Sequence, residues 1–90
     1  MRILESISEM LNIPTHKIEV MELTTVNIVG ISIDLVEDWD ASTCAGLTSS
    51  IIEEAKKIYG AEYKYRVEFN FCGRTRYKLT HLGNQAADFK

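Results

Sequence analysis

The sequence predicts an α+β domain, a two-layer α/β sandwich in which two helices cover one face of a four-stranded, mainly antiparallel sheet. Three observations lead to this prediction. Residues 2–11 and 40–59 carry apolar side chains at helical spacing, residues 17–36 are rich in β-branched side chains, and residues 62–82 alternate between apolar and polar. The resulting αββαββ order would bury both helical stripes against the sheet. The order of the strands within the sheet stays open.

The first predicted element is a short amphipathic helix at residues 2–11. Its apolar side chains recur at helical spacing: Ile3, Leu4, Ile7, Met10 and Leu11. Asn12 and Pro14 end it, because asparagine tolerates the left-handed conformation and proline cannot continue a helix. Since an isolated helix of about ten residues is marginal in water, we expect this one to dock on the rest of the domain.

Residues 17–36 are predicted to form two strands, at 17–23 and 27–36. Apolar side chains alternate along both halves, but the alternation changes phase between them. A one-residue slip turns every later side chain to the opposite face, so the chain must turn near residues 23–25 or bulge near Gly30. One long, bent strand is the alternative.

Residues 40–59 are predicted to form the second helix. Its apolar stripe contains five residues: Cys44, Leu47, Ile51, Ala55 and Ile58. Gly60 follows, where a helix commonly ends in the left-handed conformation. The start stays open, because Asp40 as an N-cap predicts a start near residue 42, whereas a capping box at Ser50 predicts a start there.

Residues 62–82 are predicted to fold into an antiparallel hairpin that turns at Gly73. The face predicted to be buried carries these side chains: Tyr63, Tyr65, Val67, Phe69, Phe71, Tyr77 and Leu79. The outward face carries five cations: Lys64, Arg66, Arg74, Arg76 and Lys78. Only Glu68 opposes them. Such a face is either a solvated surface that discourages pairing with other chains, or a binding site for an anionic partner.

The charge is divided unevenly along the chain. The net charge is −3, but residues 1–55 carry two cations and ten carboxylates, whereas residues 56–90 carry eight cations and three carboxylates. The sequence contains no linker or low-complexity segment, so we expect residues 1–90 to form a single α+β domain.

We expect a cytoplasmic location and no membrane partner. No apolar run reaches the ~18 residues that span a bilayer. Carboxylates also interrupt the apolar N-terminus, which argues against a signal peptide.

No catalytic motif is present, and we expect no enzyme activity, no cofactor and no metal. The soft metal ligands His16, Cys44, Cys72 and His81 lack the short spacing of structural zinc sites. His81 shares the parity of the buried face and is the best acid–base candidate. A lone histidine on an apolar face, however, is more often a packing residue than a catalytic one.

Trp39 is the remaining candidate for binding, because it stands among the carboxylates of residues 37–40. At the position before an N-cap, the ring would act as a hydrophobic staple against Cys44. Tryptophan is also enriched at binding hot spots, so an interface anchor is the alternative.

These observations favour a small non-enzymatic protein that binds another protein, as an inhibitor or modulator of the kind that mobile elements carry. Its partner would be an acidic protein surface, and the binding residues would be Trp39 and the five outward cations. The alternative is a nucleic-acid-binding module that uses the same cationic face. A sequence pI near 5.3 and aromatic residues on the core side argue against it. The oligomeric state stays open, a homodimer included.

Overall fold

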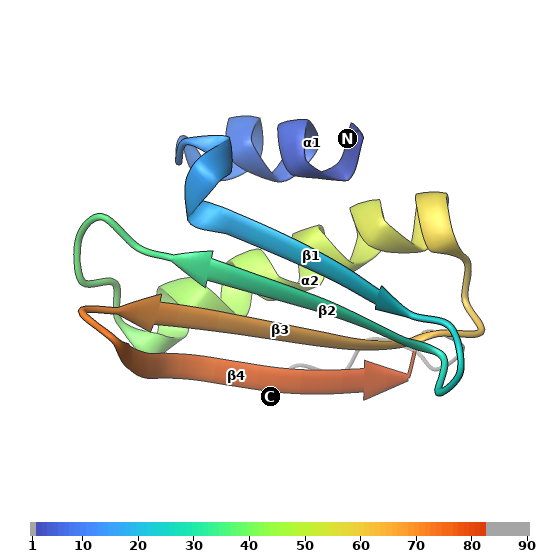
Figure 1. The fold of residues 1–90 in the computed structure, drawn as a ribbon. Coiled ribbons are helices and arrows are strands. Elements are labelled where there is room, and N and C mark those ends of the chain that lie inside the picture. The colour runs from blue at the N-terminus through green and yellow to red at the C-terminus, as the bar shows by residue number, and fades with distance from the viewer. Residues whose placement is uncertain (1, 83–90) are drawn as a thin grey trace.

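Two helices lie against one face of a four-stranded sheet (Figure 1). This computed structural model describes residues 2–82. Its elements are α1 (Arg2–Leu11), the 3-10 turn η1 (Thr15–Lys17), β1 (Ile18–Leu23), β2 (Ile28–Asp34), α2 (Ala41–Tyr59), β3 (Lys64–Phe71) and β4 (Arg74–Leu82). The predicted α+β class and αββαββ order are confirmed.

The strands lie in the order β1-β2-β3-β4, and the sheet is mixed. β1 and β2 pair antiparallel, as do β3 and β4, but β2 and β3 at the centre pair parallel. The prediction of a mainly antiparallel sheet is therefore corrected at its centre. The cause is the connection, because α2 carries the chain back along the sheet and β3 begins at the same end as β2.

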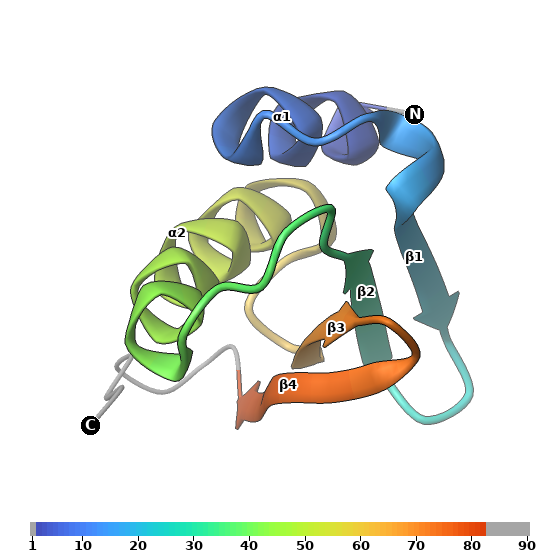
Figure 2. The same cartoon turned by 90° about the vertical axis from the view of Figure 1, so that its left-hand side faces the viewer.

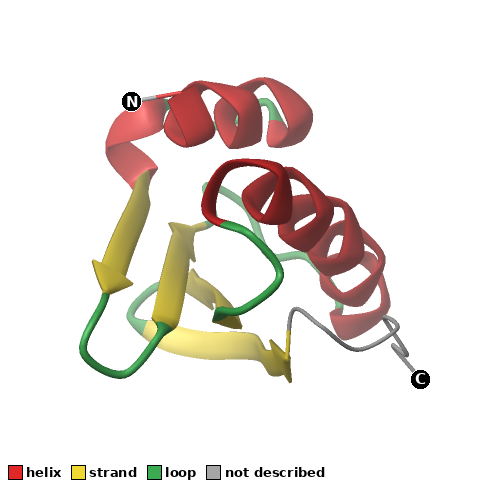
Figure 3. Ribbon diagram, turned by 90° about the vertical axis from the view of Figure 1, so that its right-hand side faces the viewer, coloured by secondary structure: helices red, strands yellow, loops and turns green. Residues whose placement is uncertain are grey.

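Both helices cover the same face of the sheet. Viewed along the sheet, α1 lies on the side of β1, and α2 lies against β3 and β4 (Figure 2). Figure 3 shows the same arrangement from the opposite side. Within residues 2–82 no helix or strand covers the other face.

The core fills the space between the two layers. Its buried side chains come from one stripe of each helix and from alternate strand positions, among them Ile3, Ile7, Val29, Ile31, Ile33, Cys44, Ile51, Ala55, Tyr65, Val67 and Phe69. Two residues of the apolar stripe predicted for the second helix are not fully buried: Leu47 is half-buried and Ile58 is 41% exposed. The buried stripe of α2 runs through Thr48 and Ile52 instead.

The helix α2 begins at Ala41, directly after its N-cap Asp40. A carboxylate oxygen of Asp40 accepts a hydrogen bond of 2.8 Å from the backbone N–H of Thr43. Because this bond stabilises the ionised carboxylate, it lowers the pKa of Asp40. The start predicted from Asp40 is confirmed, and the start at Ser50 is wrong. At the other end, Gly60 adopts a φ of 100°.

Tight turns join the strands of both hairpins. The chain turns at residues 24–27 between β1 and β2, so the alternative of one long strand is wrong. Cys72 and Gly73 have φ angles of 52° and 78°, which match the type I′ turn of a two-residue hairpin loop. Cys72 is exposed in this turn, whereas Cys44 is buried in α2, and both are free thiols.

Candidate binding face

The face of the sheet that lies away from α1 and α2 carries charged and apolar side chains in separate zones. We call it the uncovered face. Its residues alternate along each strand with those of the core: Glu19, Met21, Leu23, Ile28, Gly30, Ser32, Asp34, Lys64, Arg66, Glu68, Asn70, Thr75, Lys78 and Thr80. The strand register aligns them in rows across the sheet, and three of these rows determine what the face can bind.

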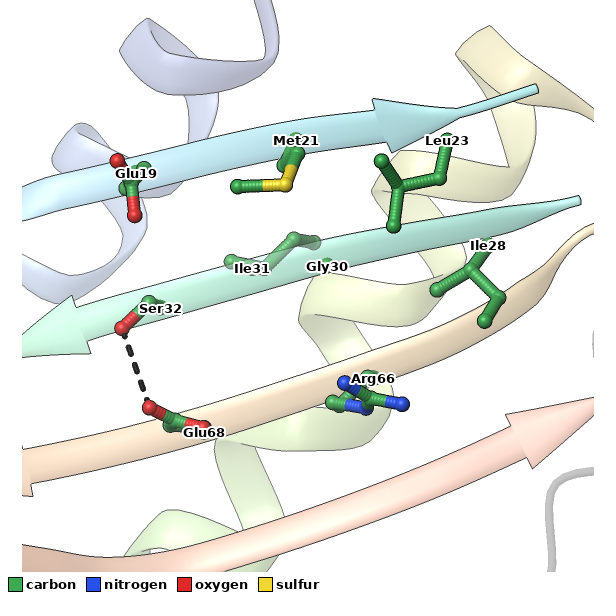
Figure 4. Close-up of a pocket in the computed structure, with 9 residues that line it drawn as sticks. All are labelled: Glu19, Met21, Leu23, Ile28, Gly30, Ile31, Ser32, Arg66 and Glu68. Atoms are coloured by element: carbon green, nitrogen blue, oxygen red, sulfur yellow. Dashed lines mark hydrogen bonds between the residues drawn. The ribbon is translucent and has the colours of Figure 1, made fainter. Parts of the chain in front are cut away.

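A hollow of about 140 Å³ opens on the uncovered face at Gly30 (Figure 4). The register places Met21 of β1 on one side of Gly30 and Arg66 of β3 on the other. Leu23 and Ile28 add apolar surface at one end. Because small-molecule sites usually enclose roughly 300 Å³ or more, this hollow is suited to one side chain of a partner.

The apolar side chains beside the hollow are unusually accessible. Met21 is 48% exposed and Leu23 is 41% exposed, and Ile28 is half-buried. They come from the neighbouring strands β1 and β2, and all three line the same hollow (Figure 4). Contiguous exposed apolar surface of this kind marks interaction sites more often than scattered single residues do.

The other end of the hollow is polar. Ser32 Oγ donates a hydrogen bond of 3.5 Å to Glu68 Oε2, and Asn70 Nδ2 donates one of 3.2 Å to the same oxygen. Thr75 Oγ1 donates in turn to Asn70 Oδ1 at 3.1 Å. This network holds the Glu68 carboxylate in place, so a fixed negative charge stands at this end.

Three predicted binding residues do meet on the uncovered face. Lys64, Arg66 and Lys78 are exposed, and the side chain of none of them forms a hydrogen bond or ion pair with another of the described residues. Lys64 and Arg66 border the apolar end of the hollow, because Lys64 is in register with Ile28. Lys78 is in register with Glu68 at the polar end.

A bulge in β4 changes the predicted outward face. Asn70 pairs with Thr75, but the preceding Phe69 pairs with Tyr77, so Arg76 is an extra residue in β4. An extra residue interrupts the regular alternation of a strand. Counting alternate residues along 74–79 of the sequence therefore does not assign every side chain to the correct face of the sheet.

Arg74 and Arg76 consequently do not join the other three cations, which corrects the predicted set of five. Nε of Arg76 lies 2.9 Å from Oδ1 of Asp38, in the loop that precedes α2. Arg74 is in register with Phe71, which packs against the core. Three carboxylates share the uncovered face with its three cations: Glu19, Asp34 and Glu68. The face is therefore divided by charge and is not uniformly cationic.

Trp39 also lies apart from the uncovered face. It is half-buried and packs against the core, with its ring centroid 6.4 Å from that of Phe69. Its Nε1 donates a hydrogen bond of 3.2 Å to Glu37. This placement agrees with a packing residue at the entrance to α2.

The groups considered for acid–base or nucleophilic chemistry are scattered. His81 is half-buried on β4, in register with Tyr65. Burial raises the pKa of Tyr65 to about 12 and also raises the pKa of the Cys44 thiol, so both groups stay neutral near pH 7. Among residues 2–82, no group of three or more His, Cys, Asp or Glu side chains is placed to hold a metal ion.

No family model, no curated protein and no solved structure matches this chain. Neither helix of the described part combines the length and apolarity needed to cross a membrane. Any functional assignment therefore depends on the geometry of the uncovered face.

Sequence reasoning missed the hollow. We considered Gly30 only as a position for a bulge, whereas it forms the floor of the site. The available signal was a glycine inside a β-prone run, which commonly marks a close approach to the backbone. That signal does not show which residues border the glycine, because they come from two other strands.

Proposed function

We propose that this protein is a non-enzymatic binding module of the cytoplasm, and that it recognises another protein through the uncovered face. The observation that carries the proposal is the contact between two zones. Exposed apolar side chains, Met21 and Leu23, line one hollow together with Arg66, and Lys64 lies next to it in register with Ile28. Within residues 2–82 neither cation has an ion-pair partner. Apolar surface bordered by charge is typical of protein interfaces, in which the charges fix orientation and speed up association.

The charge of the face sets the chemistry of the partner. Lys64 and Arg66 lie at the apolar end of the hollow, and Glu19 and Glu68 lie at the other end. A partner gains most when its own carboxylates lie over the cationic end and its apolar side chains lie over Met21. We infer an acidic protein surface, and a role as an inhibitor or modulator that covers it.

A nucleic-acid partner is less favoured by the same geometry. Every aromatic side chain among residues 2–82 is buried in the core or packs against it, so the uncovered face offers no ring on which a base could stack. The face also carries as many carboxylates as cations, and these carboxylates repel phosphate. Binding to nucleic acid is therefore the competing outcome of the capture experiment.

The test is capture of partners from an extract of the native host, with two charge-reversal variants. One variant combines Lys64→Glu with Arg66→Glu and changes the uncovered face. The matched control combines Arg74→Glu with Arg76→Glu, which changes the net charge equally but outside that face. Nuclease-treated and untreated extracts are compared, and captured proteins are identified by mass spectrometry.

We expect the unmodified chain and the control variant to capture the same host protein equally well. The variant with Lys64→Glu and Arg66→Glu should not capture it, and nuclease treatment should not release it. Capture that nuclease abolishes would favour nucleic acid. Capture that the control loses as fully as the first variant would mean that the uncovered face is not the binding site.

A further inference from the structure

Gly30 lies inside β2, where the fold does not require a glycine. Its φ is not positive, so no unusual backbone conformation demands it. A Cβ added there would lie 4.0 Å from the carbonyl oxygen of Met21, which is an ordinary van der Waals distance. Glycine is disfavoured within strands because it has no side chain to pack. The packing of residues 2–82 therefore gives no reason for a glycine at this position.

The missing side chain opens the hollow between two chemically distinct walls. Met21 presents a flexible thioether on one side, and Arg66 presents a guanidinium that has no ion-pair partner within residues 2–82 on the other (Figure 4). Within many sheets an aromatic side chain on a neighbouring strand covers a glycine. Here neither cross-strand neighbour is aromatic, so the backbone at Gly30 stays accessible.

We propose that the hollow over Gly30 receives an aromatic side chain of the partner protein, from a segment in which a carboxylate lies close to the ring. This inference rests on the proposed function and specifies its anchor. A ring that stands upright over Gly30, between the two walls, turns one face to the sulfur of Met21 and the other to the planar guanidinium of Arg66. Both are favoured neighbours of aromatic faces and edges.

The charges around the hollow give this segment a direction. Its carboxylate belongs at the end where Lys64 and Arg66 lie, because the hydrogen-bonded Glu68 and the exposed Glu19 repel it from the other end. A second copy of this chain is a poorer occupant. Among residues 2–82 no aromatic side chain lies on the uncovered face, so two copies that meet through these residues supply no ring.

Three small probes test the site by NMR titration of the ¹⁵N-labelled protein. Phenylacetate has a ring and a carboxylate, cyclohexylacetate keeps the carboxylate without aromaticity, and phenylacetamide keeps the ring without charge. We expect phenylacetate to shift the amide signals of Gly30 and Arg66. A Kd of about 1 to 10 mM is expected, because a ligand of about ten non-hydrogen atoms makes few contacts. The other two probes should bind about three- to tenfold more weakly.

Two variants locate the binding. Gly30→Ala should weaken phenylacetate about threefold or more, because the methyl group lifts the ring from the strand. Gly46→Ala, at a position of α2 where a Cβ meets nothing within 4 Å, should leave the affinity unchanged. Arg66→Lys keeps the charge but removes the planar stacking surface, so phenylacetate should then bind no better than cyclohexylacetate.

Equal affinity for phenylacetate and cyclohexylacetate, or shifts that bypass Gly30, would overturn the aromatic anchor. Shifts at Gly30 that grow with protein concentration without any probe would overturn it too, in favour of a second copy. The capture experiment tests the proposed function separately from the aromatic anchor. If Gly30→Ala still captures the host protein fully while reversal at Lys64 and Arg66 loses it, protein binding stands and only the anchor is wrong.

Discussion

Nε of Arg76 lies 2.9 Å from Oδ1 of Asp38, which ties the bulge of β4 to the loop that precedes α2. Both side chains are about half exposed, so the pair contributes little to stability. Its importance is positional. The pair keeps a cation away from the uncovered face, where Lys64, Arg66 and Lys78 remain.

The first prediction concerns nucleic acid. We expect the unmodified protein to pass through a nucleic-acid column at near-physiological salt, because three cations are offset by three carboxylates on the same face. Three phosphate contacts would instead give retention with a log–log salt slope of about −2 to −3. Tight retention with such a slope, lost on reversal of Lys64 and Arg66, would favour a nucleic-acid-binding module.

The second prediction concerns the core. Phe69 is fully buried, and its ring lies 6.4 Å from the rings of both Trp39 and Tyr77. Phe69→Ala should lower the free energy of unfolding by roughly 3 to 5 kcal/mol, measured by chemical denaturation. Because Val36 is 59% exposed, Val36→Ala serves as the control and should change it by less than about 0.5 kcal/mol. A loss below about 1 kcal/mol for Phe69→Ala would contradict the packing of the two layers.

The third prediction concerns the stability effect of Gly30. Since a Cβ fits there without strain, Gly30→Ala should raise the free energy of unfolding by about 0.5 to 1 kcal/mol. Gly46→Ala in α2 should raise it by a similar amount, because alanine favours helices by about 1 kcal/mol over glycine. Destabilisation by Gly30→Ala, with an unchanged denaturant slope, would show that the fold itself needs this glycine.

The fourth prediction is a pH dependence that arises at Asp40. Its pKa lies below the ordinary value of an aspartate in the folded state, because the ionised carboxylate accepts a hydrogen bond from the N–H of Thr43. The stabilisation is therefore present above the unfolded-state pKa and is lost as the pH falls through the folded-state pKa. Asp40→Asn keeps an N-cap acceptor but does not ionise.

Unfolding free energies of the unmodified protein and of Asp40→Asn, measured from pH 6 to pH 2, check this prediction. The two curves should run parallel above about pH 5 and approach each other or cross below about pH 4. Parallel curves over the whole range would mean that the carboxylate is not stabilised by folding.

The fifth prediction concerns the thiols. Cys72 is exposed in the hairpin turn, whereas Cys44 is buried and its pKa is raised by desolvation. Native alkylation followed by mass spectrometry should modify Cys72 well before Cys44, since the thiolate is the reactive form. After denaturation the two rates should become similar. Faster modification of Cys44, or an internal disulfide, would contradict the faces assigned to α2 and to the hairpin.

Local patterns in the sequence predicted the elements and, in most places, the side chains that face the core. Helical stripes and strand alternation depend on neighbours within a few residues, so the residues of α1 and β3 show which side is buried. The turn at Gly73 is local in the same sense and was predicted where the structure has it. The start of α2 stayed open in the sequence between Asp40 and Ser50, because both offer a local cap.

Three features follow from contacts between distant parts of the chain: the parallel pairing of β2 with β3, the bulge at Arg76 and the hollow at Gly30. The choice of neighbouring strand depends on how α2 packs across the sheet, which no short stretch of sequence encodes. The bulge depends on the partner strand, because the extra residue is defined only by the register between β3 and β4. The hollow needs Met21, Gly30 and Arg66 in one row, and Arg66 comes from β3, which is distant in sequence from β1 and β2 but lies beside β2 in the sheet.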